Sequence, residues 1–118
     1  MAIIYNKLVR DKVPANIASD GQRAVLTVVR GEELLQAMRR KVVEEANELS
    51  QAETREQAIE EIGDLLEIIA AYRKEMGIRP DEVQAAMMRK TSRSGNFTQG
   101  YFLLSVSEDS IVDLAKRR

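Results

Sequence analysis

The sequence predicts a mainly α protein: an antiparallel helical bundle with a small two-stranded β element, completed by oligomerisation. Apolar residues recur at helical spacing over two long stretches, residues 31–51 and 54–77. Only a short polar break separates these stretches, and helices joined by so short a connection pack antiparallel. The apolar residues are mostly Leu, Ile, Val, Ala and Met, which suits the packing of helix on helix.

Length and charge limit the class of protein. A chain of 118 residues is long enough for one modest core, so we expect a single domain over residues 1–118. The formal net charge is only -1 although 31% of the residues are charged. The balance gives no support for binding to a nucleic acid polymer or to a membrane surface.

The absence of two residue types limits the chemistry. Without Cys there are no disulfides, thiolate nucleophiles or sulfur-ligated metals, and without His the usual general base is missing. Catalysis would therefore depend on carboxylates, Lys, Arg, Tyr, Ser or Thr, or on a hard metal held by oxygen. No apolar run approaches the roughly 20 residues of a membrane span, and Lys7 and Arg10 come too early for a secretory signal. We expect a cytoplasmic protein.

The first thirty residues are mixed in pattern. Asp11 is suited to cap a short helix that has Pro14 in its first turn and runs to about Ala18. Residues 24–29, which are β-branched and apolar, predict a strand. The first long helix then runs from Gly31 to about Gln51.

The second long helix begins after Thr54, the predicted N-cap, and ends near Gly77. Pro80 opens a third helix that continues to about Arg93. Residues 101–106 predict a second strand, which could pair with residues 24–29, and residues 109–116 predict a last short helix.

Acidic residues cluster on the two long helices. Glu45 interrupts the apolar stripe of the first helix and Glu48 borders it, whereas Glu61 and Asp64 lie at the edge of the apolar arc of the second. Others lie on the opposite side of the second helix and are expected to be solvated: Glu56, Glu60 and Glu67. Because the two helices are antiparallel, the acids that border packed surface can meet across their interface.

The spacing of these acids has two interpretations. Glu45 and Glu48 are three residues apart, as are Glu61 and Asp64, so each pair projects from one helix face. Buried carboxylates cost several kcal/mol each unless they are paired, and few cations besides Lys41 are near. A hard divalent cation would resolve the repulsion, and oxygen ligands favour Mg²⁺ or Mn²⁺. An acid-rich helical bundle without a metal is equally consistent with the spacing alone.

The order of the motifs resembles the MazG-like all-α nucleoside triphosphate pyrophosphohydrolases. The signature EExxE followed by ExxD is matched by Glu44-Glu45-Ala46-Asn47-Glu48 and by Glu61-Ile62-Gly63-Asp64, with the frequent upstream lysine at Lys41. The N-terminal block from Tyr5 to Pro14 resembles a phosphoribosyl-ATP pyrophosphohydrolase-like branch. The segment from Lys90 to Phe97 is similar to the Lys…Arg-Gly-Gly-Phe segment of that branch, although Ser94 and Asn96 depart from it.

The resemblance implies a bundle of the all-α NTP pyrophosphatase type and a set of residue roles. Glu45, Glu48, Glu61 and Asp64 would hold Mg²⁺ on the triphosphate, with Mn²⁺ as an alternative. Glu44 would support a ligand or activate water, so that Glu44 and Glu45 are the catalytic acids. Attack by water on the α–β phosphoanhydride would give a nucleoside monophosphate and pyrophosphate. The cations implied to bind substrate are Lys41, Lys90 and Arg93.

Several of these residues also have structural interpretations. Lys41 could instead pair with Glu45 four residues on, and Lys90 and Arg93 could serve only as a basic helix end. Lys7, Arg10 and Lys12 could reach substrate or form structural salt bridges. For Tyr72 and Phe97, both of which could stack on a base, a core or interface position is the default.

The leading function is a housekeeping nucleotide pyrophosphohydrolase. Two alternatives remain open: phosphoribosyl-ATP hydrolysis in histidine synthesis, and a non-enzymatic oligomeric helical module. The apolar arc of the second long helix is wider than one chain can cover, which predicts a homodimer or a dimer of dimers. No residue of the sequence identifies the preferred base or sugar.

Overall fold

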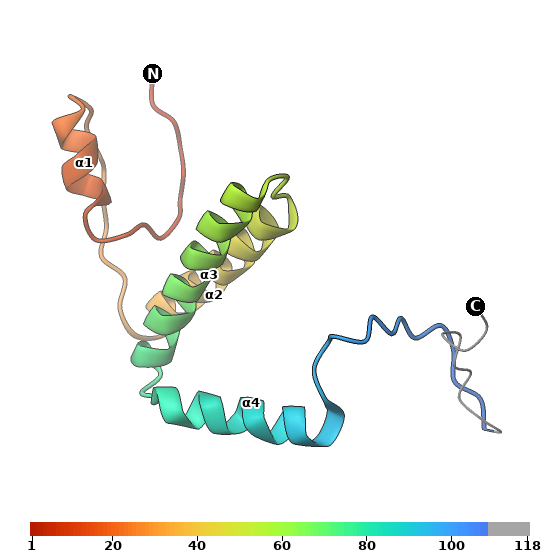
Figure 1. Cartoon of the computed structure of the whole chain (residues 1–118). Coiled ribbons are helices and arrows are strands. Elements are labelled where there is room, and N and C mark those ends of the chain that lie inside the picture. The colour runs from red at the N-terminus through yellow and green to blue at the C-terminus, as the bar shows by residue number, and fades with distance from the viewer. Residues whose placement is uncertain (109–118) are drawn as a thin grey trace. The chain divides into compact units, whose positions relative to one another are not determined.

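The computed structural model describes residues 1–108, and its regular elements in that range are four α-helices (Figure 1). They are α1 (Val13–Ser19), α2 (Gly31–Ser50), α3 (Arg55–Glu75) and α4 (Pro80–Ser94). The chain divides into two compact units, Met1–Pro80 and Asp81–Arg118. The prediction of a mainly α protein is confirmed, and the first unit holds the two long helices.

Local sequence sets the ends of the long helices. Thr54 is the N-cap of α3, and its hydroxyl accepts a hydrogen bond from the backbone N–H of Gln57 at 3.1 Å. Oε1 of the Gln57 side chain in turn accepts a hydrogen bond from the backbone N–H of Glu53, one residue before the cap. At the other end Gly77 has a positive φ of 70°, and the N–H of Ile78 bonds to the carbonyl of Arg73. This is a Schellman ending, as expected for glycine at that position.

Helices α2 and α3 lie side by side and form an antiparallel hairpin closed by residues 51–54 (Figure 1). Met38 of α2 and Ile68 of α3 are the only buried side chains among the described residues, each 8% exposed. They lie on the faces that the two helices turn toward each other. The hairpin therefore has a narrow core, and its ends and outer faces are open to solvent.

The N-terminal helix begins later than predicted. Helix α1 starts at Val13 and its N-cap is Lys12, whose side chain makes no capping bond, so the prediction that Asp11 caps it is wrong. Pro14 lies in the first turn, as predicted. Asp11 instead lines a cavity described below. No side chain caps the start of α1. At its C-terminal end, the backbone N–H groups of Asp20 and Gly21 donate hydrogen bonds to carbonyl groups of the helix.

The predicted two-stranded β element is not present in the described residues. Residues 24–29 and 101–106 contain no strand, apart from an isolated bridge at Val106. A β-branched run becomes a strand only where a second strand satisfies its backbone groups, and the two segments lie in different units. Their side chains are largely exposed, with Val25 at 93%. The helix predicted over residues 109–116 lies outside the described residues.

The apolar arc of α3 is only partly covered. The face turned to α2 is centred on Ile68, whereas the rest of the arc, where Leu66 is 59% exposed, faces solvent. Its exposed members are Ile59, Ile62, Leu66, Ile69 and Met76. None of the helices among residues 1–108 combines the length and the apolar character that a membrane span requires.

Candidate active site

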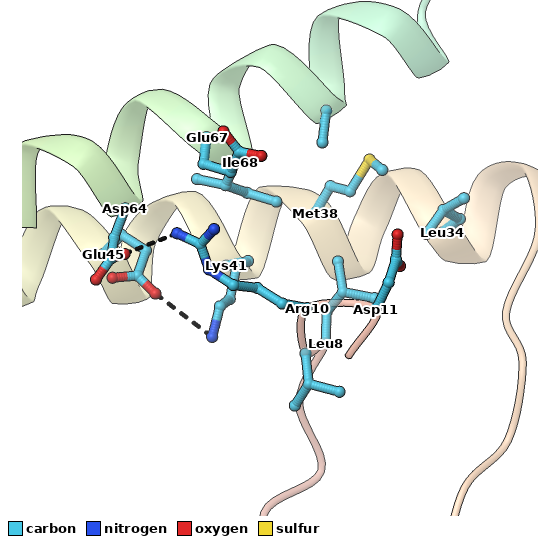
Figure 2. A pocket seen from close by; sticks show the side chains of 12 residues that line it. Leu8, Arg10, Asp11, Leu34, Met38, Lys41, Glu45, Asp64, Glu67 and Ile68 are labelled. Carbon is cyan, nitrogen blue, oxygen red and sulfur yellow. Dashed lines mark hydrogen bonds and ion pairs between the residues drawn. The ribbon is translucent and has the colours of Figure 1, made fainter. Parts of the chain in front are cut away.

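A cavity of about 340 Å³ lies where the N-terminal segment crosses the α2–α3 hairpin (Figure 2). Half of the side chains that line it are apolar and half are charged, and we call the three apolar residues Leu34, Met38 and Ile68 of the two long helices its apolar floor. The lining residues are Leu8, Val9, Arg10 and Asp11 of the N-terminal segment; Leu34, Met38, Lys41 and Glu45 of α2; and Asp64, Glu67, Ile68 and Ala71 of α3. Three separate segments of one unit therefore build the cavity.

Three carboxylates come together here, and two of them, Glu45 and Asp64, line the cavity. Glu45 of α2 and Glu61 and Asp64 of α3 each offer an oxygen, and these oxygens lie within 4.8 Å of one another. All three residues are half-buried. We call Glu45, Glu61 and Asp64 the acidic triad. The expectation that acids of both long helices meet across their interface is confirmed.

Cations neutralise part of the triad. Arg10 donates a hydrogen bond from Nη2 to Oδ1 of Asp64 at 2.7 Å, and Nζ of Lys41 lies 3.4 Å from Oε1 of Glu45 (Figure 2). The side chains of Lys41 and Glu45 are only 15% and 12% exposed, so solvent screens this pair less than the others. The pairing of Lys41 with Glu45, which the sequence left open as an alternative to phosphate binding, is present, and a role of Lys41 in substrate binding stays a prediction.

Glu61 is the member of the triad without an ion pair in the described part of the chain. Its pKa is raised above the ordinary value by desolvation first, and then by the charges of Asp64, Glu48, Glu45 and Glu60. The ionised form is thus disfavoured by negative neighbours. This is the electrostatic situation that a bound cation relieves.

Glu44 has the opposite environment. It accepts hydrogen bonds from Nζ of Lys41 at 3.1 Å and from Nζ of Lys7 at 3.2 Å. Partial burial acts to raise its pKa, but the hydrogen bonds and charges of Lys41 and Lys7 outweigh burial and lower the pKa below its ordinary value. Glu44 is therefore a firmly ionised carboxylate that holds two lysines.

The remaining predicted acids divide differently from the sequence-based expectation. Glu48 is exposed and is not one of the three grouped acids, although its charge contributes to the raised pKa of Glu61. Glu60 is exposed, as predicted. Glu67 is also exposed, as predicted, and its side chain lies at the edge of the cavity as one of the lining residues.

The candidate substrate cations and aromatics lie in different places. Lys90 and Arg93 are exposed on α4, in the second unit, and a role in phosphate binding stays a prediction for both. Tyr72 is half-buried and does not line the cavity; the guanidinium of Arg39 covers its ring at 5.7 Å and bonds to its hydroxyl. Phe97 is fully exposed in the second unit.

The donor set of the acidic triad fits a divalent metal ion. Opposite ligands in an Mg²⁺ octahedron are about 4.2 Å apart, twice the metal–oxygen distance. The three oxygens lie within 4.8 Å of one another, so side-chain rotations that drew them closer would let one ion bind all three. Because all donors are carboxylates, a hard, oxygen-preferring ion suits the set better than Zn²⁺. The cavity beside the triad has room for part of an organic ligand.

A family profile described as phosphoribosyl-ATP pyrophosphohydrolase matches residues 19–91. The match covers 73 of the 118 residues and includes all of α2 and α3, and with them the whole acidic triad. The chain belongs to this family. It is accordingly a pyrophosphohydrolase, a hydrolase acting on acid anhydrides, of the MazG-like all-α superfamily that the motifs resemble. Comparison with curated proteins and with solved structures gave no significant match.

The family assignment places the acids of this pyrophosphohydrolase in the matched region and Arg10 outside it. Motif spacing could find the acids, because i and i+3 residues share a helix face. Motif spacing could not assign a role to Lys7 or Arg10, because the sequence is equally consistent with contact to substrate and with structural salt bridges. The structure shows salt bridges to Glu44 and Asp64. The signal for these pairs was the cluster of cations between Lys7 and Lys12, but their partners are 37 and 54 residues away in sequence.

Proposed function

We propose that this pyrophosphohydrolase hydrolyses a nucleotide at its α–β phosphoanhydride, with Mg²⁺ held by the acidic triad, to a monophosphate and pyrophosphate. The observation that supports this proposal most directly is the meeting of Glu45, Glu61 and Asp64 beside a cavity with an apolar floor. The triad fits a metal on the phosphates, and the floor of Leu34, Met38 and Ile68 fits a less polar part of the substrate.

The residues of the chain divide the work. Glu45, Glu61 and Asp64 would bind the ion, and Glu48, whose charge acts on Glu61, is the further predicted ligand. When bound, the ion would neutralise phosphate charge and lower the pKa of the attacking water, with Mn²⁺ able to substitute. Lys41, already at the site through Glu45, would bind a phosphate oxygen. Lys90 and Arg93 are the further candidates for that role.

Glu44 had two predicted roles, support of a neighbouring ligand or activation of water. A carboxylate with a lowered pKa accepts a proton less readily, so Glu44 suits support better. It would keep Lys7 and Lys41 in place beside the triad. In the reaction, the water oxygen bonds to phosphorus on one side of the anhydride, and the bridging oxygen leaves on the other. The proton released from water would pass to solvent.

Two substrate classes remain, nucleoside triphosphates in a housekeeping role and phosphoribosyl-ATP in histidine synthesis. The matched family is named for phosphoribosyl-ATP hydrolysis, and this favours the second class more than motif spacing did. Both substrates carry the same α–β anhydride next to an adenosine-like or other nucleoside. The apolar floor of the cavity fits the nucleoside part of either substrate, so we propose both nucleoside triphosphates and phosphoribosyl-ATP as candidate substrates.

We also propose that the protein works as a homodimer or a dimer of dimers. The hairpin buries only Met38 and Ile68 well, while a row of apolar side chains on α3 is 42–59% exposed, including Ile62, Leu66 and Ile69. A second copy that packs against this row would bury the surface that one chain leaves open.

A pyrophosphate-release screen with Mg²⁺ tests the catalytic proposal. The panel would contain canonical and deoxy nucleoside triphosphates, modified nucleotides and phosphoribosyl-ATP. We expect turnover of at least one of them to depend on divalent metal, with a monophosphate as the second product, and to fall by at least 100-fold in Glu45→Gln. Release of orthophosphate instead of pyrophosphate, or equal rates in Glu45→Gln, would contradict it. Glu32→Gln, which breaks an exposed ion pair on α2 remote from the triad, is the matched control.

A further inference from the structure

The N-terminal block from Tyr5 to Pro14 lies outside the matched family region, yet part of it forms a wall of the cavity. Leu8 and Val9 are half-buried against the hairpin, and Arg10 and Asp11 follow them along the same wall (Figure 2). The apolar pair fixes the backbone of this segment on the cavity. The charged side chains next to it can then change partner without a change in the path of the chain.

Arg10 makes an ion pair of 2.7 Å with Asp64, and Asp64 belongs to the acidic triad. The same carboxylate therefore has two uses, as the partner of Arg10 and as a ligand for a cation. A divalent ion on Asp64 would draw negative charge away from the guanidinium and repel it. Arg10 cannot lose its proton, so once the ion is bound its guanidinium stays charged and is available to another anion.

The solvent exposure of Arg10 and Asp64 allows Arg10 to exchange the Asp64 carboxylate for another anion. The Arg10 side chain is 57% exposed and that of Asp64 is 42% exposed, so the pair is screened by solvent and is easily broken. In a loaded site the phosphate chain of the substrate, which the triad would hold through its ion, would bring new anionic oxygens into the cavity that Arg10 lines. A guanidinium binds two phosphate oxygens at once with its planar fork, which gives it a better partner than the single oxygen it contacts on Asp64.

We propose that Arg10 is a phosphate-binding residue of the site that is held on Asp64 until a divalent cation displaces it. It then binds the phosphate oxygens of the group that leaves as pyrophosphate. This inference rests on the proposed function and extends it to a segment outside the family region. Arg10 thus opposes metal binding in the free protein and favours phosphate binding in the loaded one.

These two effects have opposite signs, and this makes the inference testable without turnover. Titration calorimetry would measure Mg²⁺ binding to the full chain, and then binding of pyrophosphate at saturating Mg²⁺, in wild type, Arg10→Gln and Arg10→Lys. We expect Arg10→Gln to bind Mg²⁺ alone roughly two- to fivefold more tightly, the strength of an exposed ion pair. We expect it to bind pyrophosphate roughly tenfold or more weakly, because a charge-assisted bond is lost.

Arg10→Lys keeps the charge without the fork, so its pyrophosphate affinity should lie between those of wild type and Arg10→Gln. The control is Arg39→Gln, which breaks the ion pair with Glu32 outside the triad and should leave both affinities unchanged. Weaker Mg²⁺ binding in Arg10→Gln, or unchanged pyrophosphate binding, would overturn the inference while the proposed function stands. Failure of wild type and Arg39→Gln to bind Mg²⁺ with or without pyrophosphate would refute the proposed function and this inference together.

Discussion

Replacement of Asp64 by Asn separates a metal-binding role for the acidic triad from a structural one. Asn keeps the shape of the side chain but removes its charge, and with it the strongest attraction to a divalent ion. In the metal-free protein the substitution also removes the ion pair with Arg10 at 2.7 Å. It relieves at the same time the repulsion that Asp64 exerts on Glu61.

The magnitudes of these effects are well separated. Loss of an exposed ion pair costs about 0.2–1 kcal/mol, and the relieved repulsion acts against that cost, so metal-free stability should change by less than about 1 kcal/mol. An ion present at 100 times its dissociation constant stabilises the wild type by about 2.7 kcal/mol. With an unfolding entropy of about 2.1 cal/mol/K per residue, that stabilisation is a rise in Tm of roughly 11 °C for a chain of this size.

Scanning calorimetry at fixed protein concentration, in EDTA and in saturating Mg²⁺, measures both quantities. We expect the metal-dependent rise in Tm to be present in wild type and nearly absent in Asp64→Asn, while the two melt within a few degrees of each other in EDTA. Glu32→Gln also loses an exposed ion pair to an arginine, but outside the triad, so it should keep the full rise. An equal rise in Asp64→Asn and wild type would refute the role of Asp64 in binding the ion.

Three further predictions concern the cap, the triad and the surface of α3. Thr54→Ala removes the hydroxyl that accepts from Gln57 and should cost about 1 kcal/mol in thermal unfolding, whereas Thr54→Ser should be nearly neutral; equal losses would contradict a capping role. Because the pKa of Glu61 is raised in the folded protein, the folded state binds a proton at Glu61 more tightly than the unfolded chain does. The free energy of unfolding therefore falls as the pH rises from the ordinary pKa of glutamate to the raised pKa. Glu61→Gln should therefore raise the Tm in EDTA at neutral pH, with no gain at a pH low enough to protonate Glu61, and a gain that persists in acid would contradict this reasoning. Leu66→Glu places a charge in the exposed apolar row of α3 and should shift sedimentation toward the monomer. The control Glu60→Lys changes a charge on the exposed opposite side of α3 and should leave assembly unchanged. Unchanged assembly of Leu66→Glu would exclude the apolar row as the interface.

The helices could be predicted because their signals are local. Thr54, Gly77 and Pro80 mark the ends of α3 and the start of α4 within one or two residues, since caps and Pro depend on neighbouring backbone groups. The strand predicted over residues 24–29 was wrong because a strand depends on a distant partner. Nothing within that segment reveals whether such a partner exists.

The site shows the same division between local and distant signals. The i,i+3 spacing placed Glu61 and Asp64 on one helix face, and the apolar stripe placed Glu45 opposite them, so the triad could be expected. The rotation of α3 could not be predicted, because its apolar arc is wider than the face it presents to α2. Glu67 is solvated as predicted, but the cavity that it lines could not be foreseen, because the N-terminal segment that closes this cavity is distant in sequence.

The N-terminal segment supplies part of the positive charge that balances the carboxylates of the candidate site. The family region brings the carboxylates together but supplies them with one close lysine, Lys41. The other two cations on these acids, Lys7 and Arg10, come from residues outside that region. A segment that only stabilised the fold could do so by pairing with any exposed acid, yet Arg10 pairs with an acid of the triad and leaves Glu61 unpaired beside it. The triad is therefore only partly neutralised in the metal-free protein, which keeps an attraction for a divalent ion while Arg10 remains close to the phosphates that such an ion would bring.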